Sequence, residues 1–195
     1  MMQKFIKQGS QQAQRLNALA PLRMFSYNYS AATNPKVYLE VSRDGQKQGK
    51  LVFELFENHS PALALNFAAL CQGQEQGRSL VGTHLANGLP GYGVHGGVIE
   101  GDEENLGATN ARLADENLEM RHFKRGILSL LNDGPHANGS QFLVTFNEAS
   151  YLNGYNNVIG QLVEGDSVLA QIEQDCDRHT GVKSTWKVEA AGAQH

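Results

Sequence analysis

The chain has 195 residues, of which 41% are hydrophobic and 18% charged, a composition that fits one soluble globular domain with an extension. The formal net charge is −4, from 16 basic and 20 acidic residues, so nothing indicates specific nucleic-acid binding. Cys71 and Cys176 form no Cys-x-x-Cys pair, which argues against a thiol redox motif or zinc site and favours free thiols over a disulfide. No apolar run approaches the roughly 18 residues of a transmembrane segment.

Residues 1–34 differ from the rest of the chain because they contain basic residues but no Asp or Glu. The basic residues are Lys4, Lys7, Arg15 and Arg23. Apolar or small residues recur at steps of three or four, a weak amphipathic helix pattern. Such a segment is typical of a mitochondrial presequence, whereas the plainer interpretation is a solvated tail. We therefore predict a mitochondrial protein, in the matrix or on the matrix face of the inner membrane.

The folded domain is predicted to begin near Asn34. Residues 36–42 and 50–56 alternate apolar and polar side chains, which predicts two strands around an Asp44-Gly45 turn. Ser60 is the expected N-cap of a helix that begins with Pro61 and ends at Gly73.

Residues 81–98 are rich in glycine, but no Lys-Ser/Thr pair supports a phosphate-binding loop. Residues 101–125 carry several acids without the spacing of a calcium loop, so we predict a solvated loop, no metal site and no cofactor. Further strands are predicted at 126–131, 141–146, 157–163 and 185–190, and a second helix at 166–174.

The segment Asn132–Phe142 reads N-D-G-P-H-A-N-G-S-Q-F. By itself it could belong to any antiparallel hairpin, but the string closely resembles the signature segment of the cyclophilins, which are peptidyl-prolyl isomerases. Gly96-Gly97 and residues 115–117 (Asp-Glu-Asn) resemble further family motifs, and the resemblance covers about residues 35–190. It implies a mainly β fold, a closed eight-stranded antiparallel barrel with two capping helices, formed by residues 35–195 and preceded by the basic extension 1–34.

The resemblance also implies a peptide groove, and here the sequence departs from the family. Cyclophilins place an arginine directly after a histidine, on the strand before a Pro-Gly turn. Counted from His84, that arginine corresponds to Leu85, although the run to Pro90 is two residues longer than in the family. The other corresponding groove residues are Tyr92, Gly93, His95, Asn132, Gln141, Leu143, Tyr151 and Asn156. Asn132 and Gln141 are retained, whereas the pocket methionine, its second phenylalanine, the rim tryptophan and the groove histidine are replaced.

Leucine cannot donate a hydrogen bond to a twisting amide, so we predict that catalysis is lost. The leading hypothesis is a catalytically inactive accessory subunit of a large mitochondrial assembly, such as a respiratory-chain complex or the mitoribosome. Residues 1–34 would dock on neighbouring subunits or lipid headgroups. The alternatives are a weak prolyl isomerase that assists mitochondrial protein folding, with His95 in place of the arginine, and a proline-peptide binding module without catalysis.

Overall fold

The structure is a computed structural model that describes residues 27–73 and 77–194. Its barrel strands are β1 (Lys36–Arg43), β2 (Gln46–Leu55), β3 (His84–Leu89), β4 (Gly93–Gly96), β5 (Ile127–Asn132), β6 (Asn138–Thr145), β7 (Val158–Glu164) and β10 (Trp186–Gln194). The other elements are α2 (Pro61–Gln72), α3 (Asp166–Asp175), the 3-10 turn η1 (Ser150–Leu152) and a ribbon of β8 (Cys176–Asp177) with β9 (Gly181–Val182).

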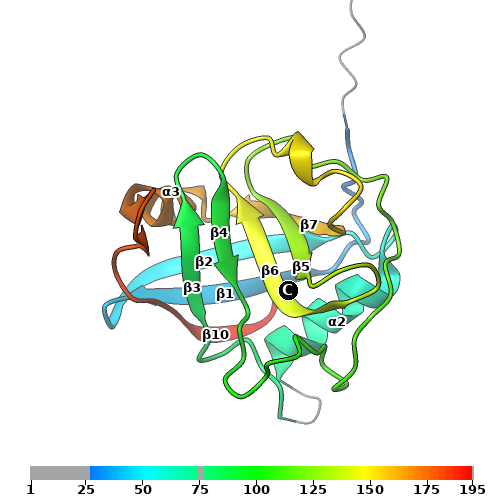
Figure 1. Cartoon of the computed structure of the whole chain (residues 1–195), viewed down its shortest axis with the longest axis horizontal. Helices are drawn as coiled ribbons and strands as arrows, with labels where there is room; N and C mark the ends of the chain where they lie inside the picture. The colour runs from blue at the N-terminus through cyan, green and yellow to red at the C-terminus, as the bar shows by residue number, and fades with distance from the viewer. Residues whose placement is uncertain (1–26, 74–76, 195) are drawn as a thin grey trace, which may run out of the picture.

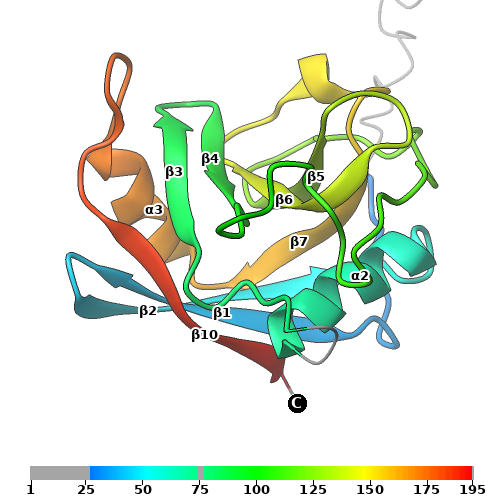
Figure 2. The ribbon, with the colours of Figure 1, turned by 60° about the horizontal axis from the view of Figure 1, so that its bottom comes forward.

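The predicted fold class is confirmed. Eight strands close into a barrel in the order β1-β10-β3-β4-β6-β5-β7-β2, and every neighbouring pair is antiparallel (Figure 1). Closure leaves the eight-stranded sheet without a free edge. The two helices lie at opposite ends of the barrel (Figure 2).

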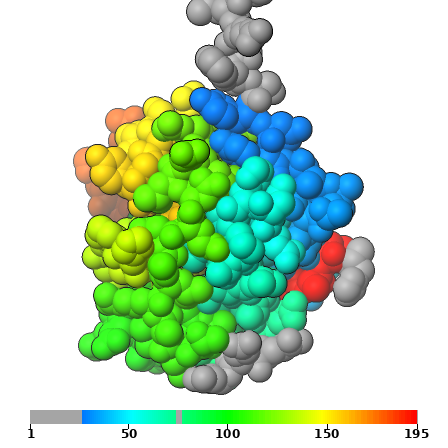
Figure 3. All heavy atoms as spheres, turned by 90° about the vertical axis from the view of Figure 1, so that its right-hand side faces the viewer, coloured from blue at the N-terminus to red at the C-terminus, as the bar shows by residue number. Residues whose placement is uncertain are grey.

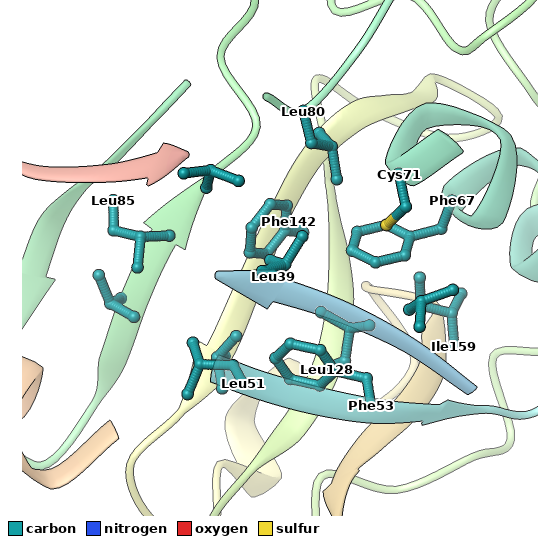
Figure 4. Close-up of a cluster of buried hydrophobic side chains, with 14 of the residues drawn as sticks. Leu39, Leu51, Phe53, Phe67, Cys71, Leu80, Leu85, Leu128, Phe142 and Ile159 are labelled. Carbon is teal, nitrogen blue, oxygen red and sulfur yellow. The ribbon is translucent and has the colours of Figure 1, made fainter. Parts of the chain in front are cut away.

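Alternation along the strands builds the core. Val37, Leu39 and Val41 of β1 are at most 1% exposed, as expected for one face of a strand that points inward. Figure 4 shows residues of five strands meeting α2 in one cluster, which includes Leu39, Leu51, Phe53, Leu128, Phe142, Ile159, Phe67 and Cys71. The Phe67 and Phe142 rings meet edge to face at 5.4 Å, so α2 is fixed to the barrel interior.

Helix α2 begins and ends where the sequence predicts, but its cap differs. Pro61 stands in the first turn and Gly73 ends the helix in the left-handed conformation, with φ of 63°. Ser60 makes no side-chain cap hydrogen bond. Instead, the Glu116 carboxylate accepts hydrogen bonds from the backbone N–H groups of Ala62 and Leu63, at 3.1 and 2.8 Å. A carboxylate at a helix N-terminus also meets the positive end of the helix dipole, so the capping group comes from a distant loop.

Residues 27–34, which we call the N-terminal strap, pack on the outside of the barrel. Glu54 of β2 is 4% exposed, and its carboxylate accepts hydrogen bonds from Ser30 Oγ, the Ala31 N–H and Asn34 Nδ2 at 2.8–3.0 Å. Gln161 of β7 donates a further bond to it at 2.9 Å. These bonds lower the pKa of Glu54 even though burial alone raises it.

Aromatic packing completes the strap. The Tyr29 ring lies edge-on to Phe56, His59 and Phe123, with centroids 5.4–5.8 Å apart. Tyr29 also accepts a hydrogen bond from the Arg121 N–H at 3.1 Å. Residues 27–34 of the predicted extension are thus packed against the barrel, and residues 1–26 lie outside the described residues.

Both cysteines are buried free thiols, as predicted. Burial and the nearby acids Asp175 and Glu173 raise the pKa of Cys176 to about 11.

Candidate functional site

Several of the predicted groove residues lie on the outer side of β3, β4 and β6. We call this outer side, together with Tyr151 of η1, the site face. Across these strands Ala86 pairs with His95, and His95 pairs with Leu143. Their neighbours in sequence, including Leu85, Val94 and Phe142, belong to the barrel core. Side chains alternate along each strand, so the row from Ala86 to Leu143 faces outward.

Gly93 and Leu143 together fill the middle of the site face. A Cβ atom on Gly93 would lie 2.6 Å from the Val144 backbone oxygen and 2.7 Å from Leu143 Cδ1. Leu143 is 0% exposed although it lies outside the barrel. Space that a larger side chain at position 93 would need is therefore occupied by backbone and by Leu143.

Tyr151 covers the next position. Its ring stacks on that of Tyr92, with centroids 5.7 Å apart and an interplanar angle of 18°. Tyr151 remains 56% exposed, whereas burial raises the pKa of Tyr92. The offset between the two rings is a favourable aromatic contact, so the pair forms an apolar cover over this part of the site face.

His95 lies beside this cover, with its ring centroid 6.0 Å from that of Tyr92. Its Nε2 atom is buried and has no hydrogen-bond partner. Burial lowers the pKa of His95, so the imidazole is uncharged at neutral pH. The histidine thus offers no fixed positive charge to a ligand.

Two amide side chains near the site face, those of Asn132 and Asn156, already have partners. Asn132 Nδ2 donates to the Tyr155 carbonyl oxygen and Asn156 Nδ2 to the Leu130 carbonyl oxygen, each at 3.0 Å. Gln141 is half-buried, and its backbone N–H donates to Asn105 Oδ1 at 3.0 Å. The donors of Asn132 and Asn156 therefore hold loops of the chain in place.

A protein-family model described as "Cyclophilin type peptidyl-prolyl cis-trans isomerase/CLD" matches residues 37–193. The chain belongs to the cyclophilin family. The match spans all eight barrel strands, in agreement with the closed barrel and its two helices.

The prediction that Leu85 lies in the groove is wrong. Leu85 is not on the site face: it is 2% exposed, pairs with Trp186 of β10 and points into the core (Figure 4). The register between β3 and β4 shifts between Ala86 and Leu89, and Asn87 has a φ of 51° at this bulge. His84 is exposed, pairs with Lys187 and lines a cavity of about 730 Å³ together with Ala86, Val81 and Val98.

Counting back from Pro90-Gly91 resolves the two-residue discrepancy. The family's histidine then corresponds to Ala86 and its arginine to Asn87. Both residues are exposed at the bulge opposite His95. The turn was the better anchor, because strand pairing fixes Leu89, directly before the turn, opposite Gly93 of the neighbouring β4, whereas His84 pairs with β10, on the other side of β3. On this count, Asn87, a short and uncharged amide, is the residue expected at the arginine position.

A second polar group of this cyclophilin resembles a catalytic relay but is structural. His122 Nε2 lies 2.9 Å from Ser129 Oγ, and its Nδ1 lies 3.0 Å from Asn153 Oδ1. Ser129 and His122 are both 0% exposed, so no substrate reaches the hydroxyl. Burial lowers the pKa of His122, and the chain of hydrogen bonds fixes the loop around residue 122 to β5 and η1.

Within residues 27–73 and 77–194, no group of three or more His, Cys, Asp or Glu side chains is arranged to hold a metal ion. The helices of the same residues include none long and apolar enough to cross a membrane.

Proposed function

We propose that this cyclophilin lacks efficient isomerase catalysis and serves as an accessory subunit of a large mitochondrial assembly, a respiratory-chain complex or the mitoribosome. The observation that carries the first part is the filled site face. Leu143 and the Gly93 backbone occupy its centre, Tyr151 covers Tyr92, and Asn87 stands in the arginine position.

Prolyl isomerisation breaks no bond but must lower a rotation barrier of about 18–20 kcal/mol. A catalyst lowers this barrier with hydrogen-bond donors that bind the twisted amide of the transition state more strongly than the planar amide of the substrate. An asparagine amide is shorter than arginine and uncharged, and the uncharged His95 does not replace the missing charge. By comparison with other preorganised donors, the loss is about 2–4 kcal/mol, or roughly thirtyfold to a thousandfold in rate.

The outer face of α2 supports the second part of the proposal. The helix sequence PALALNFAALCQ contains no charged residue, and Leu65 is 55% exposed. A cavity of about 200 Å³ separates this face from the loop at residues 108–113 and is lined by Ala62, Leu65, Asn66, Ala69, Ala108, Thr109 and Leu113. A surface helix normally carries charges on its outer face. An uncharged face with an exposed leucine therefore fits contact with another subunit.

The strap extends this proposed contact. Tyr29 touches His59, which precedes the N-cap residue Ser60 of α2, and Tyr27 is 40% exposed. In Figure 3 the first described residues, in blue, border the cyan surface that leads into α2. Of the predicted docking segment 1–34, we assign the contact to residues 27–34, which are fixed to the barrel. The acid-free, basic residues 1–26 support import into mitochondria.

Affinity purification of a tagged chain from mitochondria, together with a proline-peptide isomerase assay, tests both parts. The proposal expects stable co-purification with the subunits of one assembly and no substantial isomerase activity. Substantial activity without stable partners would instead support the weak isomerase. Saturable proline-peptide binding without activity or stable partners would support the peptide-binding module.

A further inference from the structure

The cavity of about 730 Å³ touches the site face through Ala86 but is otherwise lined by residues outside that face. One wall is formed by residues 79–84, which lead into β3, and the other by residues 98–100, which follow β4. Val81 and Val98, one from each wall, are 45% and 56% exposed. The size of the cavity and the two exposed apolar side chains fit a binding site, and neither part of the proposed function uses it.

The two walls are not paired with each other. β3 and β4 run side by side (Figure 1), and their pairs are Ala86 with His95 and Leu89 with Gly93. Among the described residues, no pair of these two strands lies beyond Ala86 toward the cavity. Although the barrel is closed, its sheet is therefore open between the beginning of β3 and the stretch that follows β4.

Both walls offer backbone groups to a partner. The Thr83 carbonyl oxygen accepts a hydrogen bond from the Val188 N–H of β10 at 2.9 Å. Backbone groups of successive strand residues point to opposite sides, so those of His84 point away from β10 and toward the cavity. On the other wall, the N–H and C=O groups of Val98 have no hydrogen-bond partner among the described residues. An extended peptide satisfies such groups with its own backbone, as an added strand does at a sheet edge.

The side chains of the second wall specify which peptide fits. Ile99 packs against the barrel core, so its neighbours Val98 and Glu100 share the outward side. Glu100 is exposed, and it is the one acidic residue among the described residues that line the cavity, which include no Lys or Arg. Directly opposed side chains of paired strands touch each other. A fitting peptide therefore has an apolar residue opposite Val98 and a Lys or Arg two positions away, opposite Glu100.

We propose that this cavity binds an extended basic segment of a partner protein as an added strand between residues 79–84 and 98–100. The segment carries an apolar residue and, two positions from it, a Lys or Arg. The inference goes beyond the proposed function, since it concerns another surface than α2 and depends neither on the loss of catalysis nor on the mitochondrial location.

The walls are held in place before any partner binds. Arg78, next to Ser79, donates hydrogen bonds to the Asp102 carboxylate and, at 2.8 Å, to the Leu106 carbonyl oxygen. The Asp102 N–H in turn donates to the Ile99 carbonyl oxygen at 3.1 Å. The charge of Arg78 is thus matched by Asp102, which leaves Glu100 for the partner. A site formed in advance loses less conformational entropy on binding.

The first experiment titrates the ¹⁵N-labelled full-length chain with the capped peptide Lys-Thr-Val-Thr-Lys and follows backbone amides by NMR. The peptide is symmetric around its valine, so it presents the required pattern in either strand direction. We expect saturable shifts at His84, Val98 and Glu100, with a Kd of about 1 mM or lower. No saturable shift at these amides would overturn the proposal. Shifts there that grow with protein concentration without peptide would assign the cavity to a second copy of the chain and would also overturn it.

Two altered peptides test the two kinds of contact. The same sequence N-methylated at its valine and both threonines loses the backbone donors, and we expect at least about tenfold weaker binding. Glu-Thr-Val-Thr-Glu reverses the charge, and at low salt we expect binding weaker by about fivefold or more. Equal affinity of the N-methylated peptide would rule out an added strand, and equal affinity of the acidic peptide would rule out recognition by Glu100.

Variants of the chain test the wall itself. Val98→Lys removes the apolar contact and repels the basic peptide, so binding should fall at least about tenfold, whereas the matched exposed-valine variant Val163→Lys should bind normally. Glu100→Gln should weaken binding about twofold to fivefold and reduce its dependence on salt. Thermal unfolding of each variant verifies that the barrel is intact. Unchanged binding by a folded Val98→Lys variant would overturn the proposal.

Discussion

The stacked rings of Tyr92 and Tyr151, 5.7 Å apart at their centroids, cover the part of the site face next to His95. Cyclosporin, the family's usual inhibitor, contacts the arginine, the second pocket phenylalanine and the rim tryptophan. Here these positions hold Asn87, Leu143 and Tyr151. We therefore expect no submicromolar binding in a calorimetric titration, with an ordinary cyclophilin as the positive control. Tight binding would mean that the Tyr151 ring moves aside readily.

The filled site face also predicts that the lost methionine wall cannot be rebuilt at Gly93. The Cβ atom of Gly93→Ala would meet the Val144 backbone oxygen at 2.6 Å, so we expect a loss of about 1–3 kcal/mol in the free energy of unfolding by urea. The matched control is Gly192→Ala on β10, whose Cβ would meet the Tyr38 ring at 3.3 Å. Similar stabilities for the two variants would argue against tight packing at Gly93.

Buried histidines make stability depend on pH in a defined window. Burial lowers the pKa of His122 and of His95, so the unfolded chain takes up protons before the folded chain does. Their contribution is complete above the unfolded value of about 6.5 and is lost as the pH falls below it. For His122 the expected slope is at most about 1.4 kcal/mol per pH unit.

Urea unfolding between pH 5 and 7.5 measures this slope, above the range in which the carboxylates lose charge. His122→Gln should flatten it, although the variant is less stable at every pH because the bond to Ser129 is disturbed. If the pH dependence of the unfolding free energy is the same in this variant, His122 has the same pKa in the folded and the unfolded chain.

The strap predicts different effects for two truncations. Removal of residues 1–26 keeps every contact to Glu54 and Tyr29, so the free energy of unfolding should change little. Removal of residues 1–34 strips the buried carboxylate and uncovers an aromatic cluster, and we expect a loss of about 2–5 kcal/mol. Equal stability of the two chains would mean that the strap does not stabilise the barrel.

The α2 face predicts a binding defect without a folding defect. Leu65→Lys places a charge on a residue that is 55% exposed, so thermal stability should be nearly unchanged while co-purification with partner subunits falls. Val163→Lys is the matched control, because Val163 is 39% exposed on β7. If both variants co-purify like the unchanged chain, the contact does not involve α2.

The fold was predictable from the sequence because its signals are local and consistent. Alternation in residues 36–42, Pro61 with Gly73 around α2, and the Asn132–Phe142 segment each specify an element, and the resemblance assembles them into the barrel. The Glu116 cap and the Glu54 network were not predictable, because both join residues that are far apart in sequence.

The site was predictable in part. Tyr92, Gly93, His95 and Leu143 follow from their fixed distance to the Pro90-Gly91 turn and to Gln141. Leu85 was misassigned because the groove positions were counted from His84. This residue is a histidine, as in the family, but it lies two residues further from the Pro-Gly turn than the family's histidine does. The alternation of side chains cannot predict the bulge at Asn87, which has a positive φ. Alternation assumes that each residue of a strand lies opposite one residue of its neighbour, and a bulge breaks that pairing.

The most direct test of the central claim is the rate at which the purified chain accelerates cis-to-trans isomerisation of a proline peptide. The filled site face and the missing arginine predict a kcat/KM at least about thirtyfold below that of an ordinary cyclophilin measured alongside. A value within a few-fold of that reference would contradict the claim and make this protein a working isomerase.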